Sequence, residues 1–385
     1  SAHGECAPMG VRPMKTPILA TSISLLALTS SAALAGGLDR SGRPTSLIFE
    51  KGNMIELSIG QVSPSISGTD VTNAATGGIA EKFMLPGAGI RYELNDKLSF
   101  GLIMDQPFGA DVLYGTGSPM LGGTAATVSS TAYTGFLRYR FSENVSVHAG
   151  LVYQNLKANV TLGGAAYGGL NGYNAAFTGD NSTGYMVGAA YEIPDIAMRV
   201  SLTYHSTIDH DLGTTENIGG TAIAAPSSTR VTTPEAIELK FQSGVAADTL
   251  VFGSVRYSHN SETTVSPIGL TTVTSDPTKS LTSLSDSLAI DLGVGRKFNE
   301  KWSGSATVGW ERKGKSDLVS PLGATNGSTF LALGASYQLN DTTKISGGVR
   351  YTKFGDAKAQ TADTARATFT GSNAVSAGMR IQFSF

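Results

Sequence analysis

The chain has 385 residues, a formal net charge of -2 and only 15 % charged side chains, against about 25 % in an average globular domain. So little charge is unusual for a water-soluble protein of this length, and the scattered, nearly balanced basic residues exclude a nucleic-acid partner. The hydrophobic fraction of 41 % is too low for a helical membrane protein. These values suit an outer-membrane β-barrel, because lipid covers its outer band and its lumen accommodates polar side chains.

The amino terminus resembles a secretion signal. Met14-Lys15 precedes an apolar run from Ile18 to Leu28, and a small-residue region ends at Ala33-Leu34-Ala35. This order predicts a cleaved signal peptide over residues 14–35, with residues 1–13 as an upstream extension. A membrane helix is the alternative, but the run is too short and its flanks do not fit. The only cysteine, Cys6, precedes the cleavage site, so we expect no disulfide and no thiol chemistry.

A short polar turn then recurs at intervals of about fifty residues, with alternating apolar and polar residues on both sides. Such a turn between two alternating runs predicts a β-hairpin. The six turns are Asn95-Asp96-Lys97, Ser142-Glu143-Asn144, Pro194-Asp195, Ala247-Asp248-Thr249, Asn299-Glu300-Lys301 and Asn340-Asp341-Thr342.

The alternating runs are the predicted strands, which in chain order cover 54–62, 88–94, 98–104, 133–141, 145–153, 185–191, 198–204, 237–241, 251–257, 288–294, 302–310, 331–339, 345–351 and 375–385. One first strand, six hairpins and one last strand make fourteen, and an even number is what a closed single-chain barrel requires. We therefore predict an all-β fold, a 14-stranded antiparallel transmembrane β-barrel over residues 54–385 with both termini in the periplasm.

Long stretches rich in Gly, Ser and Thr separate the hairpins, and by the usual asymmetry of such barrels they face outside the cell. We expect these loops over 63–87, 106–125, 157–182, 208–234, 258–287, 314–327 and 355–371. Aromatic residues next to the turns predict a girdle at the periplasmic interface, formed by Tyr92, Phe100, Tyr139, Phe141, Phe298, Trp302 and Tyr337. A soluble β-propeller is the alternative with a similar repeat, but the signal peptide and the one-sided long loops favour the barrel.

With this strand number the chain resembles the FadL family, the long-chain fatty acid transporters of the outer membrane. The segment 98–109, ending in Pro107-Phe108-Gly109, is similar to that family's third strand and the loop after it. The turns within 92–99 and 296–302 also resemble the family's style. The resemblance implies passive diffusion of a hydrophobic molecule through a plugged barrel that is no enzyme and needs no cofactor.

The resemblance also implies a plug, or hatch, before the first strand. The corresponding segment is residues 36–53, which is shorter than the family's usual hatch and lacks its Asn-Pro-Ala element. Its expected plug residues are Leu38, Arg40, Leu47, Ile48 and Phe49. The expected partners are a hydrophobic small molecule and outer-membrane lipid, and we expect a monomer.

A fatty acid carrier needs an apolar groove and a cation for the carboxylate. The loop 106–125 offers apolar side chains for capture of the ligand, namely Phe108, Leu113, Tyr114, Met120 and Leu121. Self-packing of this loop over the barrel mouth is the alternative. The inward-facing cations chosen for a carboxylate site are Arg138, Arg140, Arg256 and Arg350, and pairing with lumen carboxylates is the alternative for each of them.

Other chemistry finds little support in the sequence. His205, Asp209, His210 and Asp211 lie close together, but no second group of ligands supports a metal site, so we expect none. No nucleophile motif indicates catalysis. A general porin with a water-filled channel, and less strongly an outer-membrane lipid hydrolase, are the alternative functions.

Overall fold

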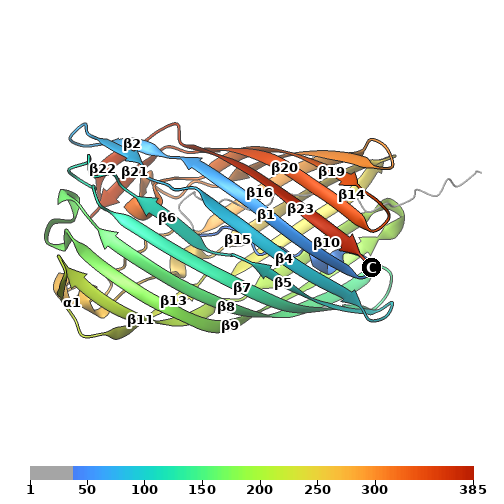
Figure 1. The fold of residues 1–385 in the computed structure, drawn as a ribbon, viewed down its shortest axis with the longest axis horizontal. Coiled ribbons are helices and arrows are strands. Elements are labelled where there is room, and N and C mark those ends of the chain that lie inside the picture. Colours follow the sequence, from blue (N-terminus) through green and yellow to red (C-terminus); the bar gives the residue numbers. More distant parts are fainter. Residues whose placement is uncertain (1–37) are drawn as a thin grey trace, which may run out of the picture.

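The computed structural model describes residues 38–385, so the predicted upstream extension (1–13) and signal peptide (14–35) lie outside the described residues. From residue 38 onward the chain forms a long antiparallel β-barrel whose strands are strongly tilted against its long axis (Figure 1). None of the helices in this part is long and apolar enough to cross a membrane.

The barrel wall confirms the predicted fourteen strands. They are β1 (Met54–Ser65), β4 (Phe83–Glu93), β5 (Leu98–Asp105), β7 (Ala125–Arg140), β8 (Val145–Leu162), β9 (Tyr173–Ile193), β10 (Met198–His205), β14 (Ala236–Ala246), β15 (Thr249–Ser258), β16 (Ser287–Lys297), β17 (Trp302–Glu311), β19 (Ser328–Gln338), β20 (Thr343–Phe354) and β23 (Asn373–Ser384). The last strand pairs with the first, from Met54 opposite Ser384 to Ser65 opposite Asn373, and this pairing closes the ring.

Asparagine side chains shape three of the short turns. The Asn95 Oδ1 atom accepts hydrogen bonds from the backbone N–H groups of Lys97 (2.9 Å) and Leu98 (3.0 Å). Asn299 and Asn340 accept equivalent bonds from the residues two and three positions later. A side chain that replaces a backbone acceptor in this way stabilises a tight turn, which explains why the turns were recognisable from the sequence.

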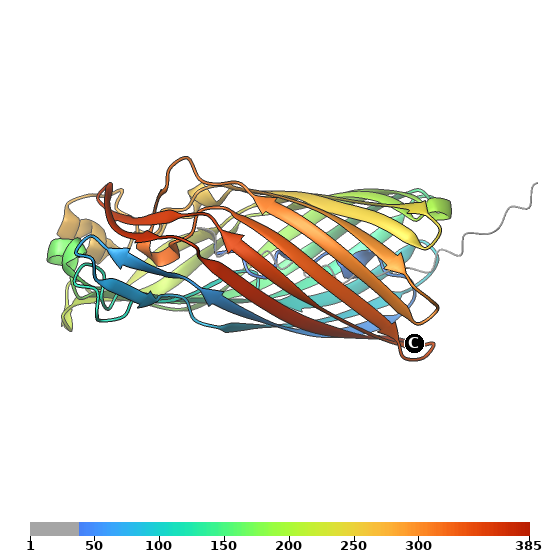
Figure 2. The ribbon, with the colours of Figure 1, turned by 90° about the horizontal axis from the view of Figure 1, so that it is seen from above.

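The predicted long loops were wrong in part, because several of these stretches continue the sheet. β8 and β9 extend through the stretch predicted as the loop 157–182, and further strands continue the wall next to β5, β10 and β14. These are β6 (Gly109–Leu113), β11 (Ile208–Ile218), β12 (Thr221–Ala222) and β13 (Ser227–Thr233). The extensions gather at one end of the barrel, together with the helix α1 (Ile268–Thr274), and the short turns lie at the opposite end (Figures 1 and 2). We call these the loop end and the turn end.

The polarity of the wall inverts along β8. From Val145 to Tyr153 the outward positions are apolar, and from Asn155 to Thr161 they are polar. The inward positions change in the opposite sense, from Ser146 and His148 to buried aliphatic residues that end at Leu162. The period of two is unbroken, but only the first half matches a lipid-facing strand. The second half therefore has an apolar interior and a water-compatible exterior.

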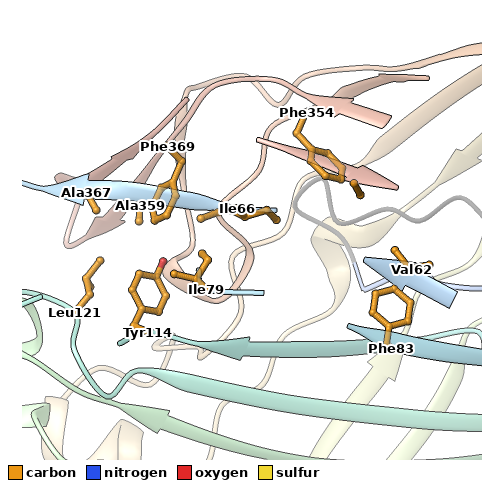
Figure 3. Close-up of a cluster of buried hydrophobic side chains, with 12 residues drawn as sticks. Val62, Ile66, Ile79, Phe83, Tyr114, Leu121, Phe354, Ala359, Ala367 and Phe369 are labelled. Carbon is orange, nitrogen blue, oxygen red and sulfur yellow. The ribbon is translucent and has the colours of Figure 1, made fainter. Parts of the chain in front are cut away.

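A second, smaller sheet closes part of the loop end. It contains β2 (Ser67–Asp70), β3 (Ala75–Gly78), β18 (Leu318–Val319), β21 (Ala357–Thr361) and β22 (Thr364–Phe369). Its buried face packs against the loop after β6, where the rings of Tyr114 and Phe369 meet edge to face with centroids 6.2 Å apart (Figure 3). The remaining helices are short 3-10 turns, namely η1 (Ser46–Phe49), η2 (Ala165–Leu170), η3 (Pro194–Ile196), η4 (Asn260–Glu262) and η5 (Pro321–Gly323).

Asp70 ties this second sheet to the loop after β6. Its carboxylate accepts hydrogen bonds from the hydroxyls of Ser118 and Thr72, both at 2.6 Å, and from three backbone N–H groups, those of Thr72, Ala74 and Met120. Burial alone would raise the pKa of Asp70, but these hydrogen bonds outweigh it and hold the pKa well below its usual range.

We predict that Asp70→Ala loosens this connection by about 1–3 kcal/mol, because several donors lose their acceptor together. Hydrogen–deuterium exchange should become faster at Thr72, Ala74 and Met120 and stay unchanged in the barrel wall. Asp276→Ala is the control, since the hydrogen bonds that the Asp276 carboxylate accepts come from Thr278, two residues later in the same loop. Because the pKa is depressed on folding, the stabilisation is complete above about pH 4 and decreases as the pH falls below it. Unchanged exchange in Asp70→Ala would contradict this role.

Candidate ligand-binding cavity

The loop end of the lumen contains an apolar cavity. Its empty volume is about 1230 Å³, counted together with its opening to solvent. Most of the lining side chains are aliphatic or aromatic, and they include Leu38, Phe108, Val112, Val128, Leu156, Val160, Phe177, Leu212, Val231, Val265, Leu281, Leu284 and Leu322. Such a volume, closed off by apolar side chains with few polar groups, is typical of a site for a hydrophobic small molecule.

The cavity walls follow from the inverted polarity of the extended strands. Leu156 and Val160 come from the inward face of β8, Phe177 from β9, Leu212 from β11 and Val231 from β13. Each of these side chains is almost fully buried. The inward positions of these strands thus carry polar side chains within the membrane band and apolar side chains at the loop end.

A loop segment, residues 259–286, covers one side of the cavity. Val265, Leu281 and Leu284 of this segment line the cavity, and the short helix α1 lies beside them. Glu216 of β11 holds the start of α1, because its carboxylate accepts hydrogen bonds from the backbone N–H groups of Gly269 (2.7 Å) and Leu270 (2.8 Å). It also accepts one from the Tyr173 hydroxyl, at 2.7 Å. The Glu216 carboxylate, which is buried, therefore anchors the helix α1 of this segment to the barrel wall.

The amino-terminal segment forms another boundary of the cavity, where the wall is interrupted between β5 and β6. Leu38 accepts a hydrogen bond from the Gly109 N–H (2.8 Å), and the Arg40 N–H donates to the Pro107 carbonyl (2.7 Å). Asp39 and Phe108 form an isolated β-bridge between these two bonds. The segment thus provides hydrogen-bond partners for the Pro107 carbonyl and the Gly109 N–H, at the point where the strand is interrupted.

Below the cavity, towards the turn end, the same segment crosses the lumen. On one side, Asp39 pairs with Arg256 of β15 (Oδ2 to Nη2, 3.0 Å) and Thr45 accepts from Lys240 of β14 (3.0 Å). On the other, Ser41 hydrogen-bonds Asp105 of β5. Two small cavities, of about 430 and 630 Å³ including their openings, lie on either side of Pro44 and contain polar and charged groups. The segment therefore crosses the lumen between these two polar cavities.

The end of this segment is an apolar anchor. Leu47, Ile48 and Phe49 are buried against inward side chains of β5, β7 and β9, among them Ile103, Phe136 and Met186. The guanidinium groups of Arg138 and Arg199 lie 4.9 and 4.5 Å from the centre of the Phe49 ring. The residues expected to form a plug thus lie inside the barrel and contact its wall.

The predicted capture residues do not share one place. Phe108 lines the cavity, whereas Leu113 is 49 % exposed. Tyr114 and Leu121 pack into the cluster beneath the second sheet (Figure 3), and Met120 is half-buried against it. The Tyr114 hydroxyl donates to the Pro321 carbonyl at 2.8 Å. For these three residues the structure agrees with self-packing, the alternative considered from the sequence.

The predicted arginines lie apart from one another and outside the apolar cavity. Arg138 pairs with Glu192, Arg140 lies 3.9 Å from Glu93, and Arg256 pairs with Asp39. Arg350 lies with its guanidinium 3.5 Å from the centre of the Phe330 ring and lines the larger polar cavity. The structure therefore does not bring them together as one carboxylate site.

The histidine and aspartate group after β10 also finds ordinary partners. His210 bonds Asp180 (3.1 Å) and Gln154 (3.0 Å), and Asp211 pairs with Arg230 (3.2 Å). Within residues 38–385 no group of three or more His, Cys, Asp or Glu side chains could hold a metal ion.

The family follows from comparison with known proteins. The model of the family described as outer membrane protein transport protein (OMPP1/FadL/TodX) matches residues 44–385. The chain belongs to this family. It is accordingly a protein of the Gram-negative outer membrane, in a family that transports hydrophobic small molecules. A search of curated proteins finds no match.

Solved structures share the fold. A FadL homologue from Pseudomonas aeruginosa is 16 % identical, with a TM-score of 0.72 over 92 % of this chain and 96 % of that one. The toluene transporter TodX from P. putida is 14 % identical, with a TM-score of 0.65 over 92 % and 94 %. The toluene transporter TbuX from Ralstonia pickettii is 14 % identical, with a TM-score of 0.60 over 88 % and 91 %. At such identities the likeness extends to the barrel fold alone.

We predict that Asp39→Asn releases the amino-terminal segment from the wall. The change removes the carboxylate paired with buried Arg256 and leaves Glu238 and Asp105 as the other negative charges that act on it, so we expect a cost of up to about 3–5 kcal/mol. Hydrogen–deuterium exchange at Arg40, Ser41 and Gly109 should become faster, because their backbone bonds depend on this docking. Glu143→Gln, in an exposed turn, is the control. Unaltered exchange at these three amides in Asp39→Asn would show that the ion pair does not hold the segment.

Proposed function

We propose that this barrel transports hydrophobic small molecules inward across the outer membrane by passive diffusion and is not an enzyme. The observation that supports this most directly is the large apolar cavity above a polar, filled lumen. Removing an apolar ligand from water into such a site is favourable by roughly 25 cal/mol per Å². A concentration gradient can then drive net movement without a coupled energy source.

In this proposal the loop end faces outside the cell and the ligand enters beside the segment 259–286. It binds among Phe108, Phe177, Leu212 and the other apolar side chains of the cavity. A shift of residues 36–53 then releases it, since this segment bounds the cavity through the hydrogen bonds of Leu38 and Arg40 to the interrupted strand. TodX and TbuX are toluene transporters, which is consistent with a cargo of this kind.

The amino-terminal segment within the lumen argues against a general porin with a wide, water-filled channel. Residues 38–49 contact strands on opposite sides of the barrel, from β5 and β7 to β14 and β15. Water and ions would have to pass through the small spaces beside Pro44. We therefore assign the segment 36–53 as a plug rather than as a surface extension.

We predict that Ala126→Phe reduces uptake of a labelled hydrocarbon such as dodecane about tenfold, because the larger ring occupies cavity volume that the ligand needs. Ala126 is 3 % exposed and lines the cavity. Uptake is measured in cells whose own transporter is absent, at equal amounts of protein in the outer membrane. Ala149→Phe, on the outward face of β8, is the matched control and should transport normally. Equal uptake by both variants would place the ligand elsewhere.

Deletion of residues 36–53 should raise ionic conductance in planar bilayers, because it empties the middle of the lumen. The intact protein should show small or no steady conductance. A large, steady conductance of the intact protein would favour the porin instead, and no increase after deletion would contradict the plug.

A further inference from the structure

The outward face of β17, β19 and β20 changes from apolar to basic towards the loop end. On β20 the exposed Tyr351 is followed two positions later by the exposed Lys353, and at the end of β17 the exposed Trp310 is followed in the same way by Arg312. The register places Thr329 of β19 opposite both Trp310 and Lys353. Exposed aromatic side chains mark the level at which a barrel passes from lipid to water. The two cations therefore lie where lipid headgroups meet the barrel.

A third cation reaches the same place from the end of β17. The Lys313 side chain runs over two glycines, since a Cβ atom at Gly327 would lie 2.8 Å from its Cγ atom and one at Gly355 would lie 2.9 Å from its Cε atom. The Gly355 N–H donates to the Gly327 carbonyl (3.0 Å), and Gly355 is two residues after Lys353. The glycines thus leave space for the Lys313 side chain to cross from β17 to the end of β20. We call Arg312, Lys313 and Lys353 the basic row.

The basic row has no carboxylate partner in the described part of the chain. Within residues 38–385 none of its three exposed side chains forms an ion pair, whereas Lys358 of β21 pairs with Asp317 (2.8 Å). Asp286, just before β16, instead accepts a hydrogen bond from the Tyr257 hydroxyl (2.9 Å). The positive charge of the row is therefore available to an anion from outside the chain, and cations at a membrane surface attract anionic headgroups.

From this arrangement we infer that the basic row binds the phosphate groups of a membrane lipid in the outer leaflet. Its guanidinium and ammonium groups donate charge-assisted hydrogen bonds to the phosphate oxygens. The acyl chains of the same lipid pack on the exposed apolar side chains further along these strands, which include Val308, Leu331 and Val349. The inference goes beyond the proposed function, because it concerns the outer surface and does not depend on the molecule that is transported. It shares with that function only the loop end facing outside.

The test uses lipid A, the phosphorylated glycolipid of the outer leaflet, and the full-length protein purified in an uncharged detergent. Native mass spectrometry measures the fraction of protein that retains the lipid over a series of lipid concentrations. The protein should bind lipid A with two phosphates at least about tenfold more tightly than the same lipid without phosphates. Inorganic phosphate at equal concentration should not displace the lipid, because it has no acyl chains to cover the apolar band.

The triple variant Arg312→Gln/Lys313→Gln/Lys353→Gln removes the charge of the basic row. It should bind phosphorylated lipid A about tenfold more weakly or worse, because the phosphates lose their charged donors. Its binding of the phosphate-free lipid should stay unchanged, since the apolar band is intact.

The matched control removes the same amount of charge from exposed side chains elsewhere on the barrel, by the substitutions Lys97→Gln, Lys157→Gln and Lys301→Gln. This control should bind both lipids as the parent does. An equal loss of binding in the control would show that only net charge matters, and would overturn the basic row as a site.

The other outcomes also decide the inference. Equal binding of the two lipids by the parent, or unaltered binding by the triple variant, would contradict it. Displacement of the lipid by inorganic phosphate would assign the basic row to a free anion and exclude the lipid as its ligand. If the triple variant does not fold, Lys353→Gln alone takes its place and should weaken binding about threefold or more. None of these results involves the apolar cavity, so the proposed function stands or fails by its own tests.

Discussion

Closure of the backbone hydrogen-bond ring is the constraint on which the rest of the structure depends. In lipid an unpaired N–H or C=O group has no solvent partner, so a strand can stay in the membrane only with a neighbour on each side. The pairing of β1 with β23 meets this requirement for the first and last strands. Closure also requires the strands to tilt against the barrel axis, and it encloses an interior that side chains or another segment can fill.

The interior is filled in two different ways. In the half with the short turns, ion pairs such as Arg138–Glu192 combine with the amino-terminal segment to occupy the lumen. In the other half, the same strands turn apolar faces inward and leave a cavity among them. The change of polarity along β8 separates the two, so a single strand contributes both to the membrane wall and to the ligand-binding cavity.

The amino-terminal segment connects these halves. Its backbone pairs with the interrupted strand at Pro107 and Gly109, and its side chains meet cations of β14 and β15. Arg40 of this segment also pairs with Asp111 of β6, next to the interruption of the wall. One short stretch therefore bounds the cavity, crosses the lumen and contacts strands on opposite sides of the barrel.

The sequence by itself determined the wall. Alternation with a period of two, interrupted by turns such as Asn95-Asp96-Lys97, requires only local information, and it predicted the strand number correctly. It misplaced the loops, because past Tyr153 the pattern continues with its polar side outward and no longer resembles a lipid-facing strand. The cavity was decided by the tertiary structure alone. Leu38, Phe177 and Leu322 meet there from distant parts of the chain. Whether an inward arginine is paired depends on the residue that the fold brings beside it, such as Glu192 of β9 for Arg138 and Asp39 of the amino-terminal segment for Arg256, and spacing along the sequence does not show this.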